Sequence, residues 1–167
     1  ALYLHAERGG GKTHLAHMWA QKAQAVFLAP DEVALPAQAA VVDNIEEWKN
    51  EEALFHLYNH TRTEKLPLLV TSARLPSALV FTLPDLLSRL KSLPLAEIAP
   101  PDDVLLSGVL RKHFSDRQLM VGEEVIDYIV KRTPRSFSAL AELAAKLDAD
   151  SLAQSRTLSV PFVRNYL

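Results

Sequence analysis

The 167-residue sequence contains no cysteine, which excludes disulfide bridges and thiolate metal sites. A chain without thiols is compatible with a reducing compartment, and we expect a cytoplasmic protein. The sequence also lacks any apolar run near the roughly 20 residues that a membrane-spanning helix needs, and it shows no signal-peptide pattern. We therefore expect no membrane partner.

An excess of either charge is missing too: 18 basic residues stand against 20 acidic residues, and the formal net charge is −2. Strong binding to nucleic acid usually requires a basic field, so we expect no strong direct DNA binding, although a local patch could still touch nucleic acid. Six histidines are scattered without metal-ligand spacing. The hydrophobic content of 49% is enough for the core of one or two small domains.

Glycine is scarce, yet three of the five glycines are consecutive: Gly9, Gly10 and Gly11. The apolar stretch before them predicts a strand and the pattern after them a helix. Strand, glycine-rich loop and helix form the architecture of a phosphate-binding loop, in which backbone N–H groups and the helix N-terminus attract phosphate oxygens. Lys12 would then contact the β- and γ-phosphates, and the Thr13 hydroxyl would coordinate Mg²⁺.

One position departs from the pattern G-x-x-x-x-G-K-[ST], because Ala6 stands where the first glycine is expected. Alanine tolerates a positive φ poorly, so the loop either opens with an ordinary φ or is slightly strained. The alternative to a phosphate-binding loop is a flexible basic turn. The two interpretations differ in whether other parts of a nucleotide site follow along the chain.

Short, mostly continuous apolar runs alternate with helical patterns over the first hundred residues, as in strands that are covered on both faces. The strand candidates are residues 1–5, 25–28, 39–43, 68–72 and 95–98. Helices are expected at residues 13–24, 47–61 and 84–90. Apolar residues share one face of the first helix and one face of the second: Leu15, Met18 and Trp19, and then Leu54, Leu57 and Tyr58. The alternation predicts an α/β fold with a parallel sheet.

The pattern changes at residues 99–103, where two prolines break any regular element and two aspartates can cap the next helix. From there only helices are expected, at residues 104–114, 123–131, 136–149 and 161–167. The third of these aligns Phe137, Leu140, Leu143, Ala144 and Leu147. The chain is therefore predicted to hold an α/β domain over residues 1–99 and a small helical domain over residues 100–167.

An acidic residue, Asp43, ends the third strand candidate. Mg²⁺ bound to a nucleotide needs a carboxylate near the phosphate loop, and a neighbouring strand end would supply one. The alternative is an aspartate that caps the following helix.

Asn44 comes next, where an ATPase of this layout would carry an acid to orient the attacking water. Asparagine is neutral and cannot act as a general base, and nothing in the spacing recommends Glu46 or Glu47, so we expect weak or absent intrinsic ATPase activity.

The fourth strand candidate ends in two hydroxyl groups, those of Thr71 and Ser72. A polar group at this strand end could touch the γ-phosphate or the catalytic water. Equally, Ser72 could begin an ordinary turn toward Pro76.

Two arginines stand at helix ends. Arg89 closes the short helix before the fifth strand candidate, where an arginine is usually a solvated partner of the helix dipole. Arg135 begins a helix of the small domain, where the dipole disfavours positive charge, so a ligand role gains weight. An arginine there could close onto a bound phosphate and couple the nucleotide state to the domain angle.

The order of these features resembles the AAA+ ATPases, and among them the DnaA-like branch with its Hda-type regulators of bacterial replication initiation. The resemblance lies in residues 51–59 (EEALFHLYN), in residues 83–90 (LPDLLSRL) and in the tail, and it covers nearly the whole chain. It implies an AAA+ P-loop domain with a parallel β-sheet over residues 1–99, followed by a small all-α lid domain over residues 100–167.

The resemblance also implies a nucleotide site for ADP or ATP with Mg²⁺. Asp43 would be the Walker B aspartate that binds Mg²⁺ together with Thr13, and Asn44 would occupy a degenerate second Walker B position. Ser72, or Thr71, would be sensor 1. The nucleotide-binding residues would be those of the Walker A end and sensor 2: Gly9, Gly10, Gly11, Lys12, Thr13 and Arg135.

Arg89 would be an arginine finger that acts on nucleotide held by a neighbouring protomer. The partners implied are DnaA–ATP and the DNA polymerase sliding clamp, and a homodimer is open. In this family a clamp-binding motif precedes the phosphate loop; the sequence starts inside a strand, so we expect a further segment upstream. The function implied is an ADP-bound regulator that promotes hydrolysis of DnaA-bound ATP. The alternatives are a slow ATPase in its own right, or an initiator-related scaffold with a degenerate nucleotide site.

Overall fold

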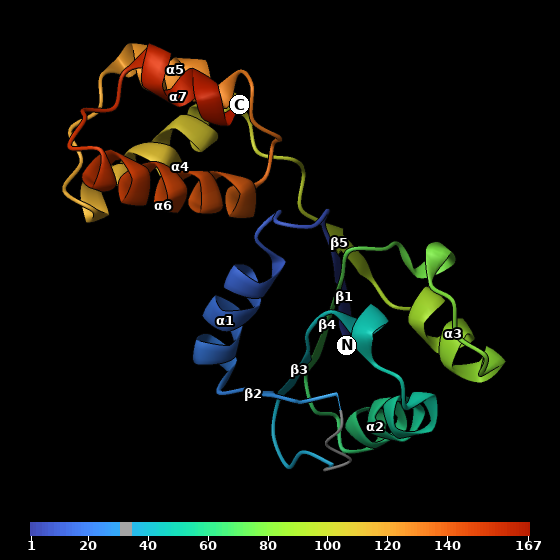
Figure 1. The fold of residues 1–167 in the computed structure, drawn as a ribbon. Coiled ribbons are helices and arrows are strands. Elements are labelled where there is room, and N and C mark those ends of the chain that lie inside the picture. The colour runs from blue at the N-terminus through green and yellow to red at the C-terminus, as the bar shows by residue number, and fades with distance from the viewer. Residues whose placement is uncertain (31–34) are drawn as a thin grey trace. The chain divides into compact units, whose positions relative to one another are not determined.

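The computed structural model describes residues 1–30 and 35–167. The chain divides into two compact units, Ala1–Ile98 and Ala99–Leu167 (Figure 1). Each buried cluster lies within one unit, so each unit has a hydrophobic core of its own. No helix in the described parts of the chain is long and apolar enough to cross a membrane.

The first unit is built on a five-stranded parallel sheet with the spatial order β2-β3-β4-β1-β5. Its strands are β1 (Leu2–His5), β2 (Val26–Phe27), β3 (Ala40–Val42), β4 (Leu68–Ser72) and β5 (Leu95–Glu97). Every expected strand is present, and the predicted fold class is confirmed. The order places β3, β4 and β1 side by side in the middle of the sheet, so the ends of these three strands lie next to one another.

Helices cover both faces of this sheet. In Figure 1, α1 lies on one side of the strands, and α2 and α3 lie on the other. The elements are α1 (Lys12–Ala23), η1 (Ile45–Glu47), α2 (Glu51–Thr63), η2 (Pro76–Ala78) and α3 (Pro84–Lys91), where η marks a short 3₁₀ turn. Residues 47–50, which we expected to begin the second helix, precede it instead, because the Asn50 side chain accepts a hydrogen bond from the Ala53 amide (3.0 Å) and caps α2.

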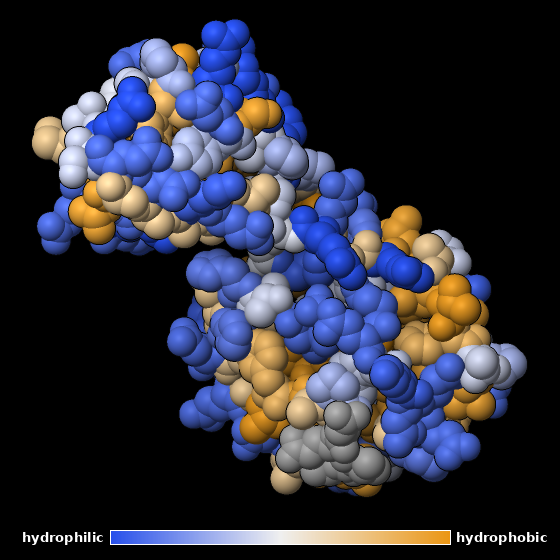
Figure 2. All heavy atoms as spheres, in the orientation of Figure 1, coloured by the Kyte–Doolittle hydropathy of each residue, from blue (hydrophilic) through white to orange (hydrophobic). Residues whose placement is uncertain are grey.

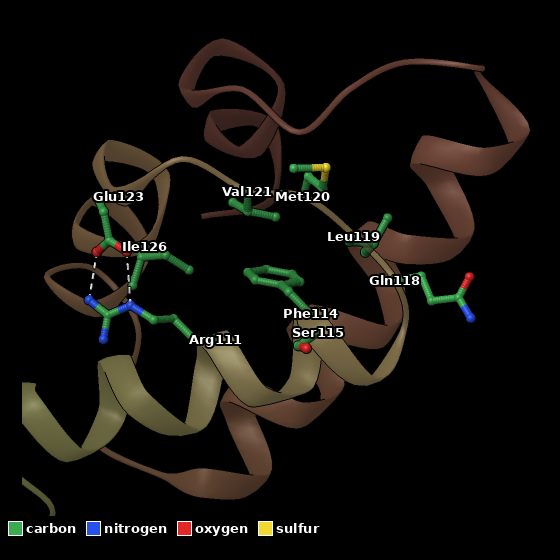
Figure 3. A pocket seen from close by; sticks show the side chains of 9 residues that line it. All are labelled: Arg111, Phe114, Ser115, Gln118, Leu119, Met120, Val121, Glu123 and Ile126. Carbon is green, nitrogen blue, oxygen red and sulfur yellow. Dashed lines mark hydrogen bonds and ion pairs between the residues drawn. The ribbon is translucent and has the colours of Figure 1, made fainter.

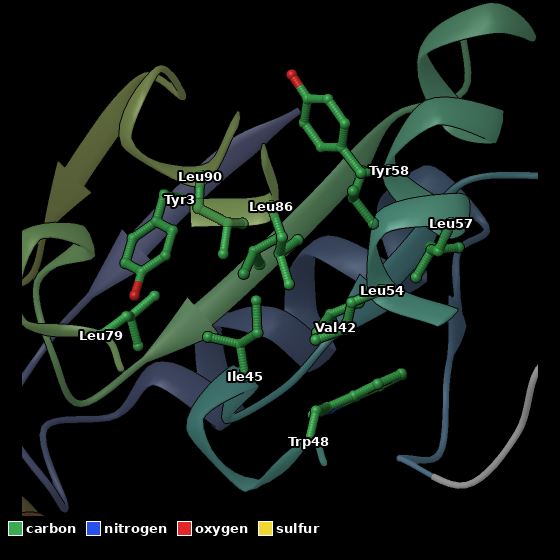
Figure 4. Packing of buried hydrophobic residues seen from close by; sticks show 13 residues of the cluster. Tyr3, Val42, Ile45, Trp48, Leu54, Leu57, Tyr58, Leu79, Leu86 and Leu90 are labelled. Atoms are coloured by element: carbon green, nitrogen blue, oxygen red, sulfur yellow. The ribbon is translucent and has the colours of Figure 1, made fainter. Parts of the chain in front are cut away.

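Side chains that alternate along the strands build two separate clusters. Tyr3 and Val42 face the α2–α3 side, where they pack with the predicted buried residues of α2 (Figure 4). Leu4 and Val41 face the opposite side, where they pack with α1. The sheet is therefore apolar on both faces, which explains the continuous apolar runs in the sequence.

The face of α1 that packs on the sheet differs from its apolar sequence face. Ala16 and Ala20 are buried against the strands, whereas Leu15 and Met18 are exposed and Trp19 is only partly buried. Small residues let the helix approach the sheet closely, and this brings the loop before α1 near the strand ends.

The second unit consists of helices α4 (Asp103–Asp116), α5 (Glu123–Val130), α6 (Phe137–Ala153) and α7 (Val160–Val163), followed by η3 (Arg164–Tyr166). Asp102 and Ser136 cap α4 and α6 through the amides of Leu105 (2.8 Å) and Ala139 (3.4 Å). The aligned apolar residues of α6 pack with α4, α5 and α7 in one core. The last expected helix is interrupted, because its second half forms a 3₁₀ turn.

Candidate functional site

A loop between β1 and α1 meets the ends of β3 and β4 at the carboxyl edge of the sheet. Gly9 and Gly11 have φ values of 72° and 90°, and Gly11 is the residue from which α1 starts. A Cβ atom on Gly10 would lie 3.0 Å from the Glu7 carbonyl oxygen and 3.1 Å from the Ala6 Cβ. The tight winding of this phosphate loop therefore depends on its glycines.

Ala6 does not weaken the loop through strain. Its φ is not positive, and its side chain is buried. Of the two possibilities that the sequence left open, the loop opens with an ordinary φ, so alanine is accommodated at this position without backbone cost.

Lys12 folds back into the phosphate loop. Its ammonium group donates hydrogen bonds to the carbonyl oxygens of Ala6 (2.9 Å) and Glu7 (3.1 Å), and the residue is 5% exposed. Burial lowers the pKa of the Lys12 ammonium, although the nearby carboxylates of Glu46 and Asp43 oppose this shift. The amine is thus held at the centre of the loop, where phosphate oxygens could replace the two carbonyl groups as acceptors.

Asp43 does not cap the helix that follows it. Its carboxylate accepts hydrogen bonds from the hydroxyl groups of Thr13 (2.9 Å) and Thr71 (2.5 Å). These contacts join the start of α1 to the ends of β3 and β4. A threonine hydroxyl beside a carboxylate is the kind of oxygen pair that Mg²⁺ bound to a nucleotide prefers, so the residues fit the metal that the sequence implies.

Asn44 follows in a left-handed conformation, with φ 49° and ψ 61°. Asparagine is among the few residues that tolerate this conformation. Its backbone N–H donates to the Thr71 hydroxyl oxygen (2.9 Å), so the turn after β3 is tied to β4. The conformation gives a physical reason for asparagine here, and the side chain provides no carboxylate.

Glu46, which the spacing did not recommend, supplies a carboxylate at this edge of the sheet. It accepts hydrogen bonds from the Ser72 hydroxyl (2.7 Å) and the Ala73 amide (2.8 Å). Burial alone would raise the pKa of Glu46, but these hydrogen bonds and the charge of Lys12 hold it below its ordinary value. The η1 turn brings Glu46 back over the strand end, and no pattern in the sequence predicts that turn.

Ser72 is fully buried, and its hydroxyl is used twice. The hydroxyl donates a hydrogen bond to Glu46, and its oxygen accepts one from the Arg74 amide (2.9 Å). The second bond forms a turn after Ser72, which was one of the two alternatives that the sequence left open. The hydroxyl protons of both Thr71 and Ser72 therefore point at carboxylates. Either hydroxyl must leave its carboxylate before it can donate to a phosphate.

A hollow of about 460 Å³ opens beside the phosphate loop. Glu7 and Arg8 of the loop line it together with residues of the two strand ends, Glu46, Glu47, Ala73 and Arg74. Among the residues that the structure describes, no group of three or more His, Asp or Glu side chains is placed to hold a metal ion. A metal at this edge would therefore need further ligands from a nucleotide.

The two candidate arginines have different surroundings. Arg89 is partly exposed on α3, and its guanidinium has no hydrogen bond or ion pair to any residue in the ranges 1–30 and 35–167. The Arg135 guanidinium binds the Pro101 carbonyl oxygen (3.1 Å) and the Asp103 carboxylate (2.8 Å), so it ties the start of α6 to the start of α4. Arg135 must give up these contacts to reach a ligand.

The comparisons with known proteins agree with this geometry. A family model described as "Hda, lid domain" matches residues 104–167. The fold resembles domain III of the replication initiation protein DnaA from Thermotoga maritima, with a TM-score of 0.80 and 17% identity over 97% of this chain and 80% of that chain. Residues 104–167 thus resemble the lid domain of Hda, and the chain as a whole has the fold of DnaA domain III.

Two further solved structures share this fold. A replication initiator DnaA bound to AMPPCP and single-stranded DNA has a TM-score of 0.74 and 17% identity, over 92% of this chain and 57% of that chain. The RuvB Holliday junction branch migration motor of Thermotoga maritima has the same TM-score and identity, over 98% and 59%. Our chain thus spans little more than half the length of these two proteins, and at such identities the likeness shows the fold alone.

The second unit, which holds the match to the lid domain, has a hollow of its own, about 270 Å³ in volume. Figure 3 shows the Phe114 ring facing Val121 and Ile126 across it, with the ion pair between Arg111 and Glu123 at one side. The hollow continues the apolar core between α4 and α5.

Proposed function

We propose that this chain is an AAA+ regulator of DNA replication initiation that holds ADP or ATP and promotes hydrolysis of the ATP bound to DnaA. Arg89 acts in trans as its arginine finger. The nucleotide in the chain's own site sets its conformation. A positively charged guanidinium stabilises the charge that develops during phosphoryl transfer, so one residue suffices to stimulate a partner's site.

The observation that carries the proposal is the position of Arg89 on α3. The helix is fixed to the sheet by buried leucines, and the guanidinium has no partner within the described ranges. An arginine on a rigid element, with its charge available, is suited to enter the site of another molecule.

The surface around α3 is compatible with a protein partner. Figure 2 shows apolar side chains over η2 and α3. Val80, which lies between these two elements, is 83% exposed. Apolar residues beside a free arginine are the composition that protein interfaces favour.

The nucleotide site supports a holding role. The Lys12 ammonium inside the loop supports phosphate binding, and the oxygen atoms of Thr13 and Asp43 suit Mg²⁺, which would neutralise phosphate charge when bound. The protein residues fix the loop, while Asn44 offers no base for hydrolysis. AMPPCP in a DnaA structure of the same fold adds support for an adenine nucleotide as ligand.

The test measures hydrolysis of ATP bound to DnaA in the presence of DNA-loaded sliding clamp. Arg89→Ala is expected to lower the stimulated rate by about 10³-fold or more, the usual effect of losing an arginine finger, while calorimetry with ADP gives an unchanged affinity. Lys91→Ala, on the same helix, is the matched control and should keep the stimulation. Equal loss of ADP binding and stimulation would refute the role of Arg89.

Glu46 favours a second candidate function, that of a slow intrinsic ATPase. Its carboxylate lies at the strand ends near Lys12, although its lowered pKa makes it a weak base. Turnover of ATP by the pure protein, abolished in Glu46→Gln, would support this function. Absence of turnover alone, with stimulation of DnaA, would support the regulator.

A further inference from the structure

Glu51, the first residue of α2, reaches across to the start of α3. Its carboxylate accepts hydrogen bonds from the backbone amides of Thr82 (2.9 Å) and Leu83 (2.6 Å). These amides belong to the two residues that precede α3. One side chain therefore ties the segment that enters α3 to the neighbouring helix.

The start of α3 has no comparable support of its own. Leu83 is its N-cap, and the leucine side chain cannot accept a hydrogen bond. A helix of eight residues gains little from its own hydrogen bonds and depends on its surroundings. The carboxylate of Glu51 near the N-terminus also has the sign that the helix dipole favours.

The amides of Thr82 and Leu83 lower the pKa of Glu51, so the side chain is held as a carboxylate. This is the direction expected for an acid whose charged form accepts backbone hydrogen bonds.

The placement of α3 decides where Arg89 lies. Leu86 and Leu90 point into the same cluster as Leu54 of α2 (Figure 4). Arg89 lies between these leucines in sequence and at the edge of their face, so a small shift or rotation of α3 displaces its guanidinium. A displacement of about 1 Å at a catalytic group can cost on the order of 100-fold in rate.

The other end of the connection from β4 to α3 is fixed as well. Glu46 binds the Ala73 amide (2.8 Å), and the Tyr3 hydroxyl donates to the Arg74 carbonyl oxygen (2.8 Å). Burial raises the pKa of Tyr3 to about 12, so this donor keeps its proton. With the strand end held in this way, Glu51 supplies the side-chain hydrogen bonds at the far end of the connection, where α3 begins.

We propose that Glu51 positions Arg89. By binding the amides of Thr82 and Leu83, it fixes the start of α3 and thereby the position of the Arg89 guanidinium. This inference rests on the proposed trans action of Arg89. Glu51 itself does not touch the nucleotide or the partner's reacting atoms; it acts through the backbone of α3.

The experiment compares Glu51→Ala with Glu52→Ala, a neighbouring acid in the same first turn of α2 that is exposed. Amide hydrogen exchange at Thr82 and Leu83 reports the contact directly. Calorimetry with ADP reports the nucleotide site. Hydrolysis of DnaA-bound ATP, measured against the concentration of the regulator, separates the maximal rate from the half-saturating concentration.

Glu51→Ala is expected to speed exchange at both amides by about tenfold, the effect of losing a charge-assisted hydrogen bond. It should lower the maximal stimulated rate by about tenfold or more, while the ADP affinity and the half-saturating concentration stay within about twofold. Glu51→Gln, which keeps one acceptor oxygen, should recover part of the rate. Glu52→Ala should change none of these quantities.

Faster exchange with an unchanged maximal rate would overturn the inference, because the contact would then be structural only. A shift of the half-saturating concentration alone would also overturn it, since that would place Glu51 in the interface. If Arg89→Ala itself leaves stimulation intact, the proposed function fails. This failure is distinct from a failure of the Glu51 inference, because Arg89→Ala is expected to leave exchange at Thr82 and Leu83 unchanged.

Discussion

At the scale of single residues, Lys12 supplies the positive charge inside the phosphate loop. Its ammonium group is buried and bound to two loop carbonyls. Lys12→Ala removes the charge that phosphate oxygens would meet, and we expect ADP affinity to fall by about tenfold or more, the value of a charged hydrogen bond. Calorimetry with ADP measures this. Lys22→Ala, on the exposed side of the same helix, should bind ADP as the parent does.

A second residue-scale prediction concerns Glu46 and pH. Its pKa in the folded protein lies below the ordinary 4.5, so its contribution to stability is present above that value. This contribution is lost as the pH falls through the lower folded pKa. Glu46→Gln should therefore be less stable than the parent at pH 7, and the two should converge in acid below about pH 4.5.

Urea titrations at several pH values between 3 and 7 measure this difference. Glu47→Gln is the control, because Glu47 is exposed on the same turn. If the free energies of unfolding of the parent and of Glu46→Gln differ by the same amount at every pH, the ionised carboxylate of Glu46 does not stabilise the fold.

At the scale of elements, the sequence predicts what periodicity and chain direction dictate. Asp43 and Thr71 lie at the ends of neighbouring parallel strands, and parallel strands end at one edge, so the contacts of Asp43 with Thr13 and Thr71 follow from the pattern. The spacing does not recommend Glu46, because its position depends on a 3₁₀ turn that no apolar periodicity indicates. Asn44 offers no base, but the carboxylate of Glu46, three residues beyond Asp43, lies at the same edge.

Helix α1 shows a different limit. Its apolar residues Leu15 and Met18 are exposed, while Ala16 and Ala20 contact the sheet. Apolar periodicity finds the most hydrophobic face, but close packing beside a glycine-rich loop selects small side chains. The existence of the helix was predictable, and the face that it buries was not.

At the scale of the whole molecule, the two units have separate cores, and this separation has a measurable consequence. Leu110 is fully buried among residues of the lid. Leu110→Ala removes side-chain contacts and leaves a cavity, so it should lower the free energy of unfolding of the lid by about 2–5 kcal/mol.

Hydrogen exchange resolves the two units within one sample. Amides of α4 and α6 should exchange faster in Leu110→Ala, while those of β1 and β4 keep the protection of the parent, because the core of the sheet and the core of the lid are built from different residues. Leu152→Ala removes a leucine of α6 that is 80% exposed and should change the lid by less than about 0.5 kcal/mol. Faster exchange in the strands of Leu110→Ala would instead mean that the sheet and the lid unfold as one cooperative unit.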